Sequence, residues 1–77
     1  MIDRESVKES MAAFLKQPAS KLSDDLLLAD LVTESFALVE MVIELQEEFR
    51  VRFIQEDLKN VRTVGDLTGL FESRGRE

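Results

Sequence analysis

The stretch between residues 34 and 49 constrains the fold of this chain more than any other part of the sequence. It contains no glycine or proline, the residues that most often interrupt a helix. Its apolar residues recur at intervals of four, three and four positions: Leu38, Val42, Leu45 and Phe49. Because this spacing places them on one face of an α-helix, we expect an amphipathic helix over 36–48. Its start is expected near Glu34 and Ser35.

The first seventeen residues carry a second helical pattern. Asp3 is placed to cap the helix start, with Ile2 and Val7 spaced to form a hydrophobic staple across it. Four residues recur at helical spacing and are expected in the core: Val7, Met11, Phe14 and Leu15. Pro18 disfavours helical geometry at Gln17, so this helix is expected to end there.

Residues 18–33 are predicted to form a long connection. It contains five leucines, which are expected to pack over the bundle: Leu22, Leu26, Leu27, Leu28 and Leu31. So many leucines are costly to leave in water, and a connection of this length in a small domain is usually functional or internally ordered.

Two further helices are expected after the main one. Residues 50–53 are predicted to be an extended linker, anchored by Val51 and by Phe53 or Ile54, and a short helix is predicted over 55–60. Thr63 and Asp66 have the spacing of a capping box, which opens a last helix. Its inward-facing residues are expected to be Val64, Leu67, Leu70 and Phe71. Gly75 is placed to end this helix, and residues 76–77 are expected to fray.

These elements predict one all-α domain over residues 1–77. The expected architecture is a four-helix bundle with three longer helices, one short third helix and a long loop between helices one and two. At 77 residues the chain is long enough for one modest core.

Composition excludes several classes of function. The chain has no cysteine and no histidine, so disulfides, thiol nucleophiles, Ser–His–Asp triads and histidine-ligated metals are excluded. Glu40, Glu44 and Glu47 share a helix face, but a di-iron bundle also needs histidines. The aspartates of the long connection lack the spacing of an EF-hand. We expect no metal site, and few classes of enzyme remain.

The negative charge is concentrated in the middle of the chain. The formal net charge is −6, and no basic residue lies between Lys21 and Arg50, an interval that holds eight acidic residues. Such a field repels nucleic acid; it indicates either a solvated helix face or a surface for an electropositive partner. No apolar run is long enough to span a membrane, and the N-terminus has no signal-peptide pattern, so a cytoplasmic location is expected.

Ser35 is the candidate for a chemical site. It lies at the predicted start of the acidic helix, directly after the long connection. A serine in this place is most often a simple N-cap. However, unpaired N–H groups and the positive end of the helix dipole also favour an anion there, so this serine could carry a phosphate-linked prosthetic group.

Residues 30–49 resemble the acyl carrier proteins of fatty-acid and polyketide synthesis. That family has the pattern Asp-Leu-Gly-x-Asp-Ser-Leu, followed by Val-Glu and Leu-Glu-x-Glu-Phe, where this chain reads DLVTESFALVEMVIELQEEF. The segment Thr63 to Leu67 similarly resembles the family's Thr-Val-x-Asp-Leu. The resemblance covers essentially the whole chain, and the four-helix bundle of the family agrees with the architecture expected above.

The resemblance implies a covalent carrier without catalytic activity of its own. A phosphopantetheinyl transferase would modify Ser35 with 4′-phosphopantetheine from coenzyme A, and the terminal thiol would hold acyl groups as thioesters. Partner enzymes with basic patches, such as an acyltransferase or a ketosynthase, would dock on the helix after Ser35. The implied docking residues are Glu34, Phe36, Val39, Glu40, Ile43, Glu44, Glu47 and Glu48. A monomer is expected.

Three residues depart from the family pattern. Val32 replaces its glycine, Glu34 its aspartate and Phe36 its leucine. These departures favour polyketide or related secondary-metabolite assembly over fatty-acid synthesis, which stays as an alternative. Because the chain shows no further domain, a free-standing carrier is expected. An excised part of a larger synthase would look the same. A peptidyl or aminoacyl carrier and a non-carrier acidic adaptor remain as alternatives.

Overall fold

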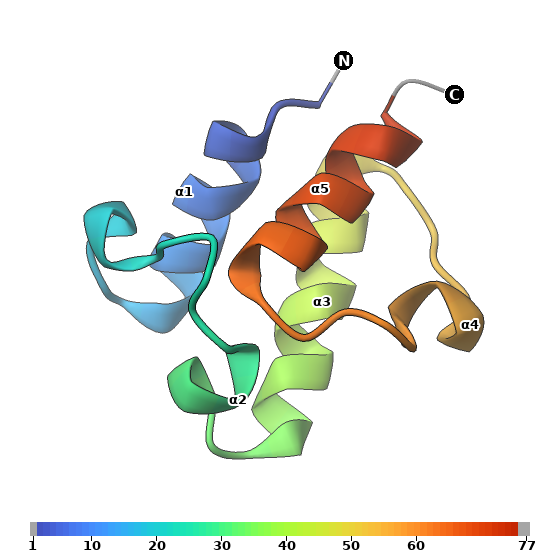
Figure 1. Ribbon diagram of the computed structural model, residues 1–77. Helices are drawn as coiled ribbons and strands as arrows, with labels where there is room; N and C mark the ends of the chain where they lie inside the picture. The colour runs from blue at the N-terminus through green and yellow to red at the C-terminus, as the bar shows by residue number, and fades with distance from the viewer. Residues whose placement is uncertain (1, 76–77) are drawn as a thin grey trace.

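The computed structural model describes residues 2–75 and confirms an all-α fold. Three longer helices form the bundle (Figure 1): α1 (Arg4–Leu15), α3 (Ser35–Phe49) and α5 (Val64–Arg74). Shorter elements lie between them: η1 (Ala19–Lys21), α2 (Leu28–Leu31) and α4 (Gln55–Leu58). Within residues 2–75 there is no β-strand, and no helix is long and apolar enough to cross a membrane. The predicted fraying of residues 76–77 lies outside the described residues.

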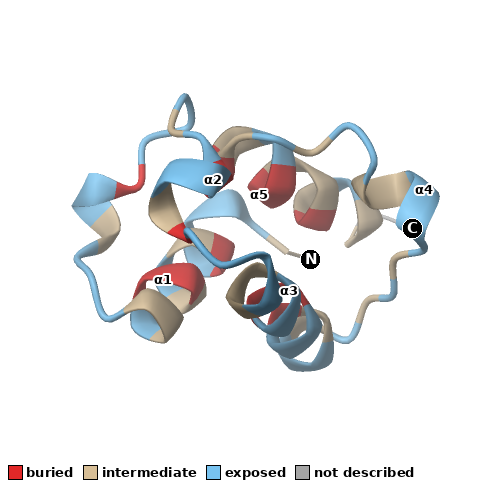
Figure 2. Ribbon diagram, turned by 90° about the horizontal axis from the view of Figure 1, so that it is seen from below, coloured by how far each residue is buried: buried red, intermediate tan, exposed pale blue. Residues whose placement is uncertain are grey.

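The core lies between the three longer helices. Helix α1 packs against both α3 and α5, and the buried positions of the three helices face one another (Figure 2). The fully buried side chains include Val7, Met11, Met41, Leu67 and Phe71. The ring of Phe71 meets those of Phe49 and Phe53 edge to face, at centroid distances of 5.8 and 4.8 Å.

Helix α1 begins as predicted but ends earlier. The carboxylate of Asp3 accepts a hydrogen bond from the Ser6 N–H at 2.8 Å, which confirms Asp3 as the N-cap. The end expected about Gln17 comes two residues earlier, since the last helical residue is Leu15 and Lys16 takes the left-handed conformation (φ 57°). The Lys16 N–H then bonds to carbonyls of the last turn. The helix is therefore stopped by a left-handed C-cap, before Pro18 exerts its restriction.

The long connection is internally ordered and contains η1 and α2, two helical turns that the sequence pattern did not reveal. Leu22 and Leu28 are buried, but the expectation that Leu27 also packs is wrong, since it is 46% exposed. Leu27 is in extended backbone and forms an isolated antiparallel bridge with Thr63. Leu27 is the extended N-cap of α2, and the turn of helix that follows it buries Leu28.

Helix α3 is buried over a wider face than the predicted stripe. Val42 and Leu45 are buried, Leu38 and Phe49 are partly buried, and Met41, which was not predicted, has no exposed surface. The helix ends at Phe49 because Arg50 is left-handed (φ 56°). Val51 and Phe53 then pack on the core, as predicted for the linker, while Ile54 is exposed.

Helix α5 starts with the predicted capping box. The Thr63 hydroxyl accepts from the Asp66 N–H at 3.1 Å, and the Asp66 carboxylate accepts from the N–H groups of Arg62 and Thr63. These backbone donors, above all that of Arg62, hold the pKa of Asp66 below its ordinary value. Val64, Leu67 and Phe71 are buried, Leu70 is half-buried, and Gly75 is the C-cap.

Candidate functional site

Ser35 is the first residue of α3 and is exposed. The N-cap position belongs to Glu34, whose side chain makes no capping bond, so the interpretation of Ser35 as an N-cap is wrong. Within residues 2–75, the Ser35 hydroxyl has no hydrogen-bond partner. The hydroxyl is therefore available to an enzyme that approaches from solvent.

The start of α3 also leaves backbone donors unpaired. The Leu38 N–H bonds to the Glu34 carbonyl at 3.2 Å, and in the described part of the chain the N–H groups of the three residues before Leu38 have no partner. The helix is 15 residues long, so these donors lie at the positive end of a sizeable dipole. An exposed hydroxyl beside unpaired donors fits a phosphodiester group held on Ser35.

The residues before Ser35 are compatible with this geometry. Val32 lies in extended backbone (φ −126°, ψ 104°) with its side chain 9% exposed. Since this conformation is open to any residue, the replacement of the family's glycine introduces no strain at Val32. The Glu34 side chain is exposed beside Ser35.

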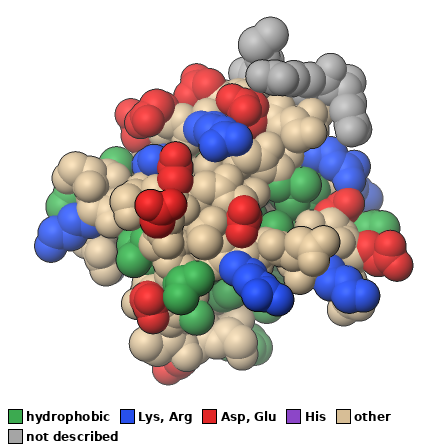
Figure 3. All heavy atoms as spheres, in the orientation of Figure 1, with side chains coloured by type: hydrophobic (Ala, Val, Ile, Leu, Met, Phe, Trp, Pro, Cys, Tyr) green, Lys and Arg blue, Asp and Glu red, His purple; other side chains and the backbone are tan. Residues whose placement is uncertain are grey.

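The implied docking residues separate into two groups around α3. Phe36, Val39 and Ile43 are exposed by 73, 56 and 48%, an unusual amount for large apolar side chains on one helix. Their helical spacing puts Glu40 and Glu47 on the same side, and we call these five residues the α3 face. Figure 3 shows hydrophobic and acidic side chains next to each other at the lower edge of the molecule.

Glu44 and Glu48 lie on a different side. Both line a hollow between α1 and α3, together with Glu9, Ser10 and other α1 residues. The Ser10 hydroxyl donates to the Glu48 carboxylate at 2.6 Å. The structure thus ties Glu48 to α1 and does not bring all the implied docking residues onto one surface.

Helices α2, α3, α4 and α5 line a cavity that the sequence analysis missed. Its volume is about 260 Å³, and we call it the apolar cavity. It is lined by Leu28, Leu38, Val39, Val42, Ile43, Gln46, Leu58, Val61 and Leu67. Leu38 and Val39 lie one helical turn from Ser35, so the cavity begins next to the candidate site. No local signal reveals it, because its walls come from four separate segments.

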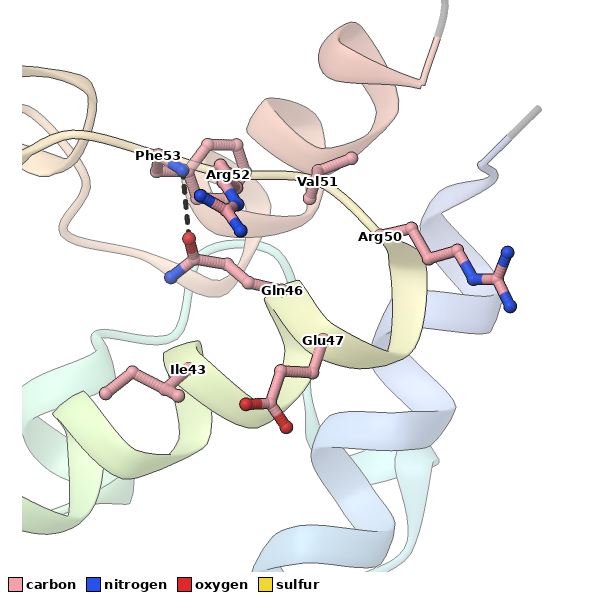
Figure 4. A pocket seen from close by; sticks show the side chains of 7 residues that line it. All are labelled: Ile43, Gln46, Glu47, Arg50, Val51, Arg52 and Phe53. Atoms are coloured by element: carbon pink, nitrogen blue, oxygen red, sulfur yellow. Dashed lines mark hydrogen bonds between the residues drawn. The ribbon is translucent and has the colours of Figure 1, made fainter.

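A second hollow of about 510 Å³ lies at the other end of α3 (Figure 4). Its wall includes Gln46, Glu47, Arg50 and Arg52, so it is polar and carries both signs of charge. Within residues 2–75, no cluster of acidic residues is arranged to hold a metal ion.

Comparison with known proteins places the chain in a family. The family model described as "Phosphopantetheine attachment site" matches residues 5–71, a range that includes Ser35. An acyl carrier protein of Kineococcus radiotolerans is 43% identical over 47 residues, which are 61% of this chain and 58% of the relative. One of Acidothermus cellulolyticus is 38% identical over 50 residues, 65% of this chain and 54% of the relative.

The chain thus spans little more than half the length of each of these relatives. The family model is the stronger finding, because it covers nearly the whole bundle from α1 to α5. Its members hold 4′-phosphopantetheine covalently and serve as carriers, generally without catalytic activity of their own. From the geometry at the start of α3 and from these matches, we conclude that the chain belongs to the acyl carrier protein family.

Proposed function

We propose that Ser35 is the attachment point of the phosphopantetheine arm and that the chain presents acyl groups on it as thioesters. The observation that carries this proposal is the exposed, unbonded hydroxyl of Ser35 at the uncapped start of α3. A flexible arm raises the local concentration of the thioester at each partner's active site, which is the contribution of a carrier.

The attachment reaction transfers the phosphopantetheine group from coenzyme A to Ser35. The Ser35 oxygen forms a bond to the pantetheine-side phosphorus of coenzyme A, the pyrophosphate bond breaks, and adenosine 3′,5′-bisphosphate leaves. The hydroxyl proton passes to a base of the phosphopantetheinyl transferase. The product keeps one negative charge, which the unpaired N–H groups at the start of α3 stabilise.

We further propose that the α3 face is the main docking surface for the transferase and for acyl-processing enzymes such as an acyltransferase or a ketosynthase. Its apolar residues supply buried area, while Glu40 and Glu47 attract a basic patch and speed the encounter. Glu34 and Glu44 add to the same negative field. Glu48 contributes less, because its carboxylate is already bonded to Ser10.

The finer assignment is a monomeric carrier in polyketide or related secondary-metabolite assembly. The support for the pathway is the set of departures at Val32, Glu34 and Phe36. Residues 1–77 as one acyl carrier domain, and the cytoplasm as its location, belong to the same proposal.

The test is intact mass after incubation with coenzyme A and a broad-specificity transferase. We expect a gain equal to one phosphopantetheine group in the wild type and no gain in Ser35→Ala. The matched control is Ser20→Ala, which changes an exposed serine outside α3 and should be modified normally. An unchanged wild-type mass with several transferases would refute the proposal and favour the non-carrier adaptor.

A further inference from the structure

The hollow of about 510 Å³ at the far end of α3, which we call the terminal hollow, continues the α3 face. Ile43 and Glu47 belong to both, and Arg50 and Arg52 line the hollow beyond them (Figure 4). These two arginines are the first basic residues after Lys21. The negative field along α3 therefore ends here, and the sign of the surface charge changes within one hollow.

The backbone of the linker after α3 is fixed on both sides of Arg52. The Val51 N–H donates to the Gln46 carbonyl at 3.1 Å, and the Phe53 N–H donates to Oε1 of the same residue at 2.9 Å. Val51 and Phe53 also pack on the core, whereas Arg52 between them is exposed. The position of this arginine is thus set before any partner arrives, which reduces the entropy lost when a partner binds it.

The two kinds of charge in the terminal hollow do not neutralise each other. Within residues 2–75, neither Arg52 nor Glu47 forms an ion pair, although both are exposed and both line this hollow. In Figure 4 the two side chains project from the linker and from α3, and Arg50 extends away from both. A partner can therefore contact each charge without breaking an ion pair inside the protein.

We infer that the phosphopantetheinyl transferase that docks on the α3 face places a carboxylate against Arg52, next to the basic patch that meets Glu47. This inference rests on the proposed function, since it needs the transferase to dock on α3. An entirely basic patch that reached the terminal hollow would meet the charge of Arg52, and juxtaposed like charges weaken a complex. A partner that fits this surface must change sign where α3 ends.

The change of sign determines which way round the transferase binds. Arg50 follows the fifteen residues of α3, so it lies about 22 Å from Ser35 along the helix axis. In a transferase turned end to end, the carboxylate would meet Glu34 or Glu40 and the basic groups would meet the arginines. Both contacts are repulsive, so Arg52 favours the orientation that brings the active site to Ser35. Arg52 is then a specificity-determining residue for docking.

The experiment measures kcat/KM for modification of the full-length chain at low salt, with excess coenzyme A and the transferase of the cell that produces this chain. Arg52→Glu should lower kcat/KM by about three- to tenfold, because the carboxylate of the transferase then faces a like charge. The loss should appear in KM rather than kcat, since Arg52 is distant from the reacting oxygen of Ser35. Raising the salt concentration should narrow the difference, because salt screens contacts between exposed charges.

Lys21→Glu is the matched control. It changes the net charge by the same amount, at an exposed lysine of η1 outside the terminal hollow. Its kcat/KM should equal or slightly exceed the wild-type value, because a more acidic chain attracts a basic patch more strongly. Unchanged Tm values for both variants would show that the reversals leave the fold intact.

A double variant separates local contacts from the overall field. Glu47→Arg combined with Arg52→Glu exchanges the two charges of the terminal hollow and leaves the net charge unchanged. A response to the overall field alone predicts the wild-type rate for this variant. Contacts at both positions predict a rate below that of Arg52→Glu, because the basic and acidic groups of the transferase then both face like charges.

Charge reversal on the transferase identifies the contact. Acidic residues around its basic patch are changed to lysine one at a time, and one of these changes should restore the rate of Arg52→Glu while slowing the wild-type chain. If Arg52→Glu is modified as fast as Lys21→Glu, or if no such change restores its rate, the inference is wrong and the carrier function stands. If the wild-type chain is not modified on Ser35, the proposed function itself fails.

Discussion

Arg74 donates to the carboxylate of Asp57 at 2.6 Å and thereby ties the short helix α4 to the last turn of α5. The guanidinium of Arg74 also lies 5.8 Å from the centre of the Phe53 ring. Helix α4 carries Leu58, a wall of the apolar cavity, and has only four residues, too few to be stable alone. This ion pair therefore helps to hold the cavity wall in place.

We predict that Arg74→Gln destabilises the protein by about 1 kcal/mol, the upper end for a partly exposed ion pair, and lowers Tm by about 4–8 °C. Amide exchange should accelerate most in α4. Lys59→Gln, which removes a charge from the exposed end of the same helix, is the control and should change little. Equal effects of the two variants would mean that the ion pair does not position α4.

The left-handed residue at the end of α3 offers a stabilising change. A residue with a Cβ at φ 56° is strained by about 1 kcal/mol relative to glycine, so Arg50→Gly should raise stability by up to that amount. Lys16→Gly, at φ 57°, should raise stability by a similar amount. Glu47→Gly, inside the helix, should instead cost about 1 kcal/mol. Chemical denaturation of the three variants tests whether the sign follows the backbone conformation.

The lowered pKa of Asp66 predicts that the stability of the fold falls at acid pH. Backbone donors lower the pKa of Asp66 in the folded protein. The ionised carboxylate therefore stabilises the fold in full above the ordinary carboxyl pKa of 3.8. This contribution is lost as pH falls through the lower, folded-state value. Wild type should therefore exceed Asp66→Asn in Tm at neutral pH, and the difference should shrink below about pH 4. A difference that stays constant down to pH 2 would contradict this role.

Truncation of Leu45 should cost far more stability than truncation of Val39, although both residues lie on α3. Leu45 is 2% exposed and Val39 is 56% exposed. Leu45→Ala is expected to cost about 2–5 kcal/mol, a large fraction of the stability of a small domain. Val39→Ala should cost well under 1 kcal/mol, because it leaves no buried cavity. Urea unfolding measures both, and similar costs would show that the core side of α3 is misassigned.

Charge reversals on α3 test the docking proposal. Glu40→Lys and Glu47→Lys should slow modification by the transferase, and the residual rate should depend less on salt. Glu48→Lys should have a smaller effect, because Glu48 lies on the α1 side and is bonded to Ser10. Wild-type rates for the first two variants at low ionic strength would mean that the α3 face is simply solvated.

Much of the fold followed from local signals in the sequence. The spacing of Leu38, Val42 and Leu45 predicted α3, and the capping residues Asp3, Thr63 and Asp66 marked the starts of α1 and α5. These signals are readable because a helix and its caps depend on residues within four positions of one another. The location of Ser35 at the start of α3 followed from the same pattern.

Only the tertiary structure decided the rest. The exposure of Leu27, the complete burial of Met41 and the bond that separates Glu48 from the α3 face depend on segments distant in the sequence. The apolar cavity also depends on distant segments, because its walls come from α2 to α5. The orientation of Gln46 does too, because the backbone N–H of Phe53 holds the oxygen of its amide. Periodicity tells which face of a helix is apolar, but which neighbour covers it, and where a gap remains, is set by the packing of all the elements together.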